Sequence, residues 1–291
     1  KEQAIERFRN ILDCGMLKLI VGNVEKLPTI KESIDYIIHG ASITGSKQFV
    51  DCPVETIMTG IEGTKNILEF AREKQIKGMV YLSSLEVYGV TDFSLKSVKE
   101  DQYGYIEQLS PRSSYSEGKR MIECMCVSYG SEYGVPVKIV RLSQTFGPGV
   151  SYEDGRVFAQ FARAAIENKN IVLKTKGETY RNYCYTRDAV IGILCVLLKG
   201  EKREAYNIAN EETGISICDM ARLVAEDIKK RKIKVIFDID DDIEKLGYAP
   251  TIKIALNTKK VQKLGWKAEI GLKEAYNRMI EYMKDTKGEK Y

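Results

Sequence analysis

Two patterns of apolar and polar positions alternate along the chain. Short runs of consecutive apolar residues, which are typical of strands buried on both faces, occur at residues 17–21, 35–39, 78–84 and 136–142. Longer stretches carry apolar residues at helical spacing, at residues 1–13, 54–75, 115–133, 189–198 and 271–284. Strands that alternate with helices predict a parallel, doubly wound sheet, so we expect an α/β fold.

The helix at residues 115–133 begins with Tyr-Ser-Glu-Gly-Lys, which places Tyr115 and Lys119 about one helical turn apart. Such a pair is commonly a solvated surface contact. If both side chains converge on a ligand, the ammonium favours the phenolate and lowers the pKa of the phenol toward the working pH. Tyr115 is therefore a candidate acid–base group, and Lys119 is the group expected to lower its pKa.

Two further motifs lie at the ends of predicted strands. The strand at 78–84 leads into Ser-Ser-Leu-Glu-Val-Tyr-Gly, which contains Ser84 and Glu86, and the strand at 136–142 leads into a segment that contains Gln144. Ligands of open parallel sheets bind at the carboxyl ends of the strands. We therefore expect these three side chains to lie near one ligand, together with Tyr115.

In this order, Ser-Ser-x-Glu-Val-Tyr-Gly, Tyr-x-x-x-Lys and Arg-x-x-Gln-x-x-Gly-Pro resemble the extended short-chain dehydrogenases/reductases that modify nucleotide sugars. That family contains sugar-nucleotide 4-epimerases, 4,6-dehydratases and glucuronate decarboxylases, and the resemblance runs from about residue 17 to the C-terminus. It implies a Rossmann-like NAD-binding domain over residues 1–148. A smaller α/β substrate lobe would follow over 149–291, with parts of 183–212 returning to the first domain.

The resemblance also implies roles for individual residues. The catalytic set would be Ser84, Glu86, Tyr115 and Lys119, with Ser84 bonded to the reacting oxygen. NAD, with NADP left open, would contact Asn23, Ala41, Ser42, Tyr115 and Lys119. A nucleotide-diphosphate sugar would contact Gln144, Arg156 and Arg181, because a planar guanidinium can form two charge-assisted bonds to phosphate or carboxylate oxygens. The helices at 54–75 and 115–133 would form a homodimer interface, with burial of their apolar residues within one subunit as the simpler alternative.

The chain departs from the family pattern at its beginning. No glycine-rich turn precedes a helix, and the nearest glycine cluster, at residues 60–64, lies inside a helical pattern. We therefore expect the chain to lack roughly 40–60 N-terminal residues, or one β-α-β unit, relative to an intact family member.

The motifs leave the reaction branch open. Leu85 stands where dehydratases carry an acidic residue, which disfavours 4,6-dehydration because leucine cannot donate a proton. Glu86 and the Asp-Gly-Arg-Val run at 154–157 resemble the decarboxylases, whereas epimerases need no carboxylate at position 86. We expect an epimerase/dehydratase-type enzyme that acts through a transient 4-keto sugar. The alternatives are a UDP-glucuronate decarboxylase-like enzyme and a non-catalytic nucleotide-sugar-binding protein on the same fold.

Composition narrows the partners further. The 45 basic and 41 acidic residues are too balanced to predict a nucleic-acid partner. No apolar run is long enough to predict a membrane span. Seven scattered cysteines fit reduced thiols in a cytoplasm, and a single histidine makes a metal site improbable.

Overall fold

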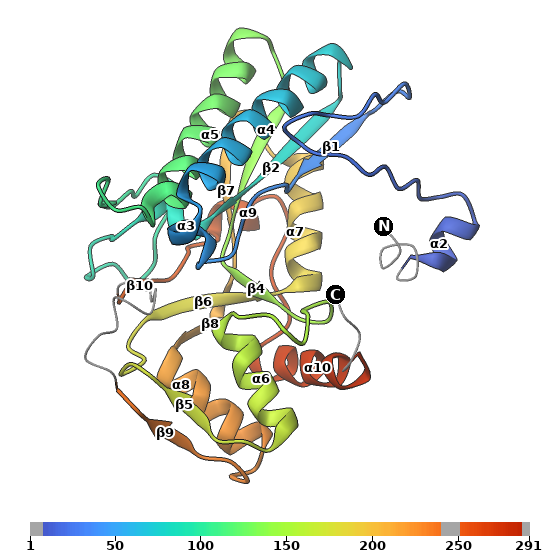
Figure 1. The fold of residues 1–291 in the computed structure, drawn as a ribbon. Helices are drawn as coiled ribbons and strands as arrows, with labels where there is room; N and C mark the ends of the chain where they lie inside the picture. Colours follow the sequence, from blue (N-terminus) through green and yellow to red (C-terminus); the bar gives the residue numbers. More distant parts are fainter. Residues whose placement is uncertain (1–7, 240–250, 287–291) are drawn as a thin grey trace.

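The computed structural model describes residues 8–239 and 251–286. Figure 1 shows an upper lobe, in which helices flank a sheet, and a lower lobe with further strands and helices. The expected α/β class is confirmed. The helices and strands of the upper lobe are α3 (Gln48–Asp51), α4 (Pro53–Glu73), α5 (Ser113–Glu132), α7 (Thr186–Lys199), α9 (Lys259–Gln262), β1 (Tyr36–His39), β2 (Gly78–Ser84), β3 (Val137–Leu142) and β7 (Ala205–Ile208).

The first sheet has the strand order β1-β2-β3-β7, and all three pairings are parallel. The central strands β2 and β3 are buried on both faces, as their continuous apolar runs predict. Met79 and Tyr81 pack with α4 and α5 on one face, whereas Val80 packs with α7 on the other. Because parallel strands end at the same edge of a sheet, the carboxyl ends of β1, β2 and β3 lie side by side there.

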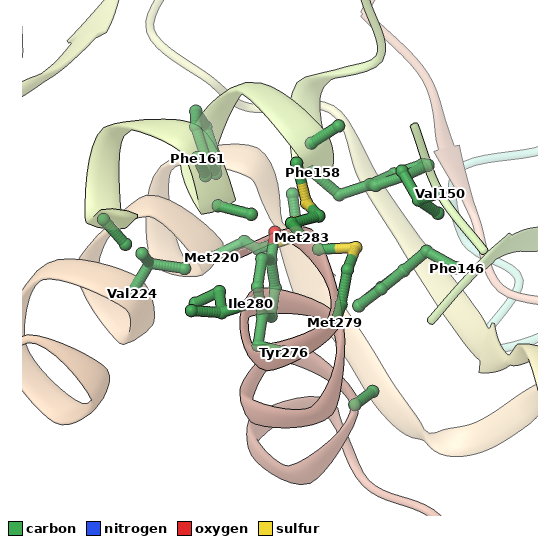
Figure 2. Close-up of a cluster of buried hydrophobic side chains, with 14 of the residues drawn as sticks. Phe146, Val150, Phe158, Phe161, Met220, Val224, Tyr276, Met279, Ile280 and Met283 are labelled. Carbon is green, nitrogen blue, oxygen red and sulfur yellow. The ribbon is translucent and has the colours of Figure 1, made fainter. Parts of the chain in front are cut away.

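The lower lobe has its own sheets and core. Its elements are β4 (Gln144–Phe146), α6 (Val157–Glu167), β5 (Ile171–Leu173), β6 (Tyr180–Tyr185), β8 (Asn210–Ser216), α8 (Ile217–Arg222), the π-helix η2 (Leu223–Ile228), β9 (Val235–Phe237), β10 (Lys253–Ile254) and α10 (Leu272–Asp285). Aromatic and methionine side chains from β4, α6, α8 and α10 fill this core (Figure 2). After β6 the chain returns to the upper lobe, where α7 packs on the first sheet and β7 joins it. The predicted division at residue 148 stays a prediction.

The N-terminal part differs from the sequence expectation. The helix predicted over residues 1–13 is described only as α2 (Arg9–Asp13), and residues 1–7 lie outside the described residues. The strand predicted at 17–21 is wrong, and Val21 is 69% exposed. A strand needs a partner for its backbone hydrogen bonds, and among the described strands only β2 pairs with β1. The predicted β-α-β unit before the chain stays a prediction.

Tyr36 and Ile38 on β1 are about half exposed, as are several apolar side chains of α7. Among the described residues, no helix is both long and apolar enough to cross a membrane.

Candidate active site

One face of α5 carries the two residues of the Tyr-x-x-x-Lys motif. Lys119 is only 4% exposed, and its ammonium donates to the carbonyl oxygen of Leu82 at 2.8 Å. The same nitrogen lies 4.7 Å from the ring centre of Tyr81 and 5.6 Å from that of Tyr115. The four-residue spacing thus directs both motif side chains toward the carboxyl end of β2.

Ser84 and Glu86 meet this face from β2 and from the 3₁₀-helix η1 (Leu85–Tyr88) that follows it. The Ser84 hydroxyl accepts the backbone N–H of Glu86 at 3.2 Å and lies beside the Tyr115 phenol, where hydrogen bonding lowers the pKa of the phenol. The Glu86 carboxylate forms an ion pair with Arg112 at 3.3 Å and accepts the Ser116 hydroxyl at 3.3 Å. The structure therefore brings Ser84, Glu86, Tyr115 and Lys119 together, while their chemical roles stay predictions.

The pKa values of the motif residues differ from the sequence expectation. Burial raises the pKa of Tyr115 to about 12; the Ser84 hydrogen bond opposes this shift and the Glu86 charge adds to it. Burial also lowers the pKa of Lys119 to about 8, against the opposing charge of Glu123. Burial has the largest effect on the pKa of Tyr115, while the Lys119 ammonium donates to a backbone carbonyl. The predicted role of Lys119 in lowering the pKa of Tyr115 stays a prediction.

The residues expected along the cofactor lie in two places. Ala41 and Ser42 follow β1, whose His39 pairs with Tyr81 of β2, so they lie at the sheet edge that also carries Ser84. Asn23 is exposed, in a turn where its side chain accepts the N–H of Glu25 at 2.9 Å. Asn66 of α4 holds that turn through the carbonyl groups of residues 24 and 25. Within the described residues, no hydrogen bond links Asn23 to any of the four residues that meet at Tyr115.

The site fits one end of a dinucleotide. An ammonium has three donors, and within the described residues Lys119 uses one of them on Leu82. The remaining donors lie beside the Tyr115 ring, where ribose hydroxyl groups could accept them. For the pyrophosphate end, the described residues contain no glycine-rich turn that leads into a helix. Tyr115 and Lys119 would thus hold the nicotinamide ribose.

The residues expected at the substrate are placed around the junction of the lobes. Gln144 begins β4, two residues after Leu142, which pairs with Ser84. Arg181 lies on β6, and its Nε is buried without a hydrogen-bond partner in the described part of the chain. Among residues 8–239 and 251–286, no hydrogen bond or ion pair joins Gln144 or Arg181 to Tyr115.

Arg156 is already occupied by an intramolecular partner. Its guanidinium contacts the Asp154 carboxylate at 2.6 Å and lies 4.8 Å from the ring centre of Phe158. The side chain is 47% exposed, so a ligand could share it only by competing with Asp154. The predicted role of Arg156 at the substrate stays a prediction.

Several residues of the site were missed by sequence reasoning. The Phe49 ring stacks on Tyr115, with ring centres 4.2 Å apart and planes within 9°. Phe49 lies far away in sequence, so no local signal could have identified it. Arg112 and Glu123 lie three residues before Tyr115 and four after Lys119, respectively. Their helical spacing was a signal that could have placed both on the face that carries the motif.

A model of the NAD dependent epimerase/dehydratase family matches residues 9–209. UDP-glucuronic acid decarboxylase 1 of Xenopus tropicalis is 30% identical over 252 residues, which cover 86% of this chain and 57% of that protein. UDP-glucuronic acid decarboxylase 6 of Arabidopsis thaliana is 30% identical over 250 residues, covering 85% of this chain and 69% of that protein. The chain thus spans little more than half the length of the Xenopus protein.

Solved structures are similar in fold. UDP-glucose 4-epimerase from Thermotoga maritima, solved with UDP-glucose, has a TM-score of 0.75 at 22% identity and covers 87% of this chain and 78% of its own. UDP-glucuronic acid 4-epimerase from Bacillus cereus, solved with NAD, has a TM-score of 0.76 at 21% identity and covers 96% and 85%, respectively. These similarities confirm the Rossmann-like class of the fold.

Proposed function

This chain belongs to the NAD dependent epimerase/dehydratase family, and from that premise we propose that it oxidises a nucleotide-diphosphate sugar to a transient 4-keto sugar. The observation that carries the proposal is the meeting of Ser84, Tyr115 and Lys119 at the carboxyl end of β2. That edge is where open parallel sheets bind their ligands.

In this proposal the chain's own residues handle the proton. Tyr115 removes the proton of the sugar C4 hydroxyl, while Ser84 holds both the phenol and the reacting oxygen. Because the pKa of Tyr115 is about 12, formation of the phenolate at pH 7 costs about 7 kcal/mol, at 1.36 kcal/mol per pKa unit. The site with its ligands bound must therefore stabilise the phenolate strongly. NAD, when bound, supplies the hydride acceptor and, when oxidised, a positive charge. The two remaining donors of Lys119 orient the ribose.

For the branch that follows, we infer decarboxylation of a nucleotide-bound uronic acid, with 4-epimerisation as the second candidate. The two curated relatives described above carry the name UDP-glucuronic acid decarboxylase, which supports the first. The buried Nε of Arg181, which has no partner in the described chain, suits a carboxylate. Glu86, held by Arg112 and Ser116 beside the Tyr115 site, would serve as a second acid–base group.

The test is an incubation of the full-length protein with NAD and UDP-glucuronate, followed by mass spectrometry and NMR of the nucleotide sugar. We expect loss of CO₂, and a Tyr115→Phe variant should be at least about 100-fold slower, because a positioned acid–base group contributes that much. Tyr105→Phe is the matched control, since Tyr105 is an exposed tyrosine bonded to Glu107.

Other outcomes decide between the alternatives. A product of unchanged mass with inverted C4 would assign epimerisation. A further outcome is that the wild-type protein forms no product while Tyr115→Phe binds the nucleotide sugar as tightly as wild type does. That result would support the non-catalytic binding protein and exclude the enzyme. NAD released in stoichiometric amount from the denatured protein would identify the cofactor, and NADP in its place would correct it.

We further propose a homodimer through α4 and α5. Both helices present exposed apolar side chains, namely Val54, Met58, Met121 and Val127, on the surface turned away from the first sheet's core. Light scattering on the purified protein tests this proposal, and the double variant Met58→Glu, Met121→Glu should be a monomer.

The proposed compartment is the cytoplasm, because all seven cysteines are free thiols.

A further inference from the structure

Three residues of α5, each four positions from the next, bind three successive residues at the end of β2. The Tyr115 phenol lies beside the Ser84 hydroxyl, which lowers its pKa, and the Lys119 ammonium donates to the carbonyl of Leu82 at 2.8 Å. One turn further along, the Glu123 carboxylate accepts the hydroxyl of Ser83 at 2.6 Å. The first two contacts belong to the candidate active site, whereas the third lies beneath it.

Glu123 is held equally firmly from a third element. Arg141 of β3 donates to it twice, from Nε at 3.0 Å and from a terminal nitrogen at 2.7 Å. Glu123 is 6% exposed and Arg141 is 2% exposed. Arg141 also donates to the Tyr88 hydroxyl at 2.9 Å and to the backbone carbonyl of Glu100 at 2.7 Å. One buried carboxylate therefore ties α5, β2 and β3 together directly below the site.

We propose that Glu123, with Arg141 as its counter-ion, is a positioning residue that fixes α5 on the end of β2. It thereby holds Tyr115 and Lys119 on their partners Ser84 and Leu82. The catalytic meaning of this arrangement rests on the function proposed above, but the arrangement itself does not. A pair that only stabilised the core could lie anywhere between α5 and β3. This one contacts the residue between the two that hold the motif side chains.

The charge of Glu123 adds a second effect. Burial lowers the pKa of Lys119, and the Glu123 carboxylate raises it again. The other titratable groups that face Lys119 are Cys126 and Tyr115 on α5, Tyr81 on β2 and His39 on β1. None of these four groups is a carboxylate, so removal of the Glu123 charge should leave more Lys119 neutral at a given pH.

The test is the variant Glu123→Gln, which keeps the size and an acceptor for Ser83 but removes the charge. Trace acetylation of the full-length protein at a series of pH values, with mass spectrometry of the Lys119 peptide, gives the titration midpoint of Lys119 without substrate or cofactor. We expect a midpoint near 8 in wild type and one lower by about 1 pH unit in the variant. The alkaline limb of the kcat profile should shift in the same direction, with KM little changed.

Thr213→Val is the matched control, because it removes a buried hydroxyl that bonds Tyr183 in the other lobe. It should lower stability while leaving the Lys119 midpoint unchanged. A folded Glu123→Gln protein with the wild-type Lys119 midpoint would overturn the electrostatic part of the proposal. If wild type turns over no nucleotide sugar, the proposed function fails. The labelling result still decides whether Glu123 raises the pKa of Lys119.

A second variant serves if Glu123→Gln does not fold. Ser83→Ala keeps the ion pair with Arg141 and removes only the bond between Glu123 and β2. We expect the Lys119 midpoint to stay near its wild-type value while kcat falls by about tenfold at unchanged KM, because a small misplacement of Tyr115 against Ser84 costs rate. A wild-type kcat in Ser83→Ala would overturn the positioning role.

Discussion

His39 is the chain's single histidine, and its burial predicts a specific loss of stability at acidic pH. It is 4% exposed, and its Nε2 lies 3.0 Å from the Thr64 hydroxyl. Burial, and then the charge of Lys119, lower its pKa from 6.5 to about 4. Unfolded chains regain the ordinary value, so below pH 6.5 the unfolded state binds a proton that the folded state does not bind.

This stability is therefore fully present above pH 6.5 and is lost as the pH falls toward 4. The difference of about 2.5 units, at 1.36 kcal/mol per unit, is about 3 kcal/mol of unfolding free energy. That is a large fraction of the stability of an ordinary domain.

Urea unfolding at several pH values measures this effect, and His39→Gln isolates it, because glutamine can still bond Thr64 but does not titrate. The stability advantage of wild type over the variant should shrink by about 3 kcal/mol between pH 7.5 and pH 4. Carboxylates that titrate in the same range contribute equally to both proteins. The imidazole resonances of the one histidine give its pKa directly by NMR. A midpoint near 6.5, or parallel pH dependences of the two proteins, would refute the reasoning.

Three further predictions concern other parts of the molecule. In Glu86→Gln, the pH midpoint of nicotinamide reduction should fall by about 0.5–1 unit, because the Glu86 charge helps to raise the pKa of Tyr115. The control Glu107→Gln, at an exposed residue, should leave this midpoint unchanged. Phe146→Ala should lower the unfolding free energy by about 3–5 kcal/mol in urea, since Phe146 is fully buried between aromatic rings (Figure 2). Cys126 should react with a thiol reagent only after unfolding, because burial raises its pKa; reaction in the native state would contradict its placement.

The N-terminal region shows the limit of strand prediction from local sequence patterns. The runs at 35–39, 78–84 and 136–142 became β1, β2 and β3, whereas the equally apolar run at 17–21 did not become a strand. Apolar runs report a preference for burial, but a strand forms only where another strand pairs with its backbone. That partner is a property of the whole sheet, and the local sequence does not contain it.

For four residues of the candidate site, the sequence alone was enough to predict that they converge. Helical spacing put Tyr115 and Lys119 on one face, and the ends of parallel strands put Ser84 and Glu86 opposite them. Both relations follow from the geometry of a single element or of neighbouring strands, which the sequence pattern encodes.

Only the tertiary structure decided the state of these groups. The raised pKa of Tyr115, the stacking of Phe49 on its ring and the pairing of Glu123 with Arg141 join segments that are far apart in the chain. A pKa depends on every atom that excludes water from the group and on every nearby charge. Such sums over long-range contacts exist only once the chain has folded.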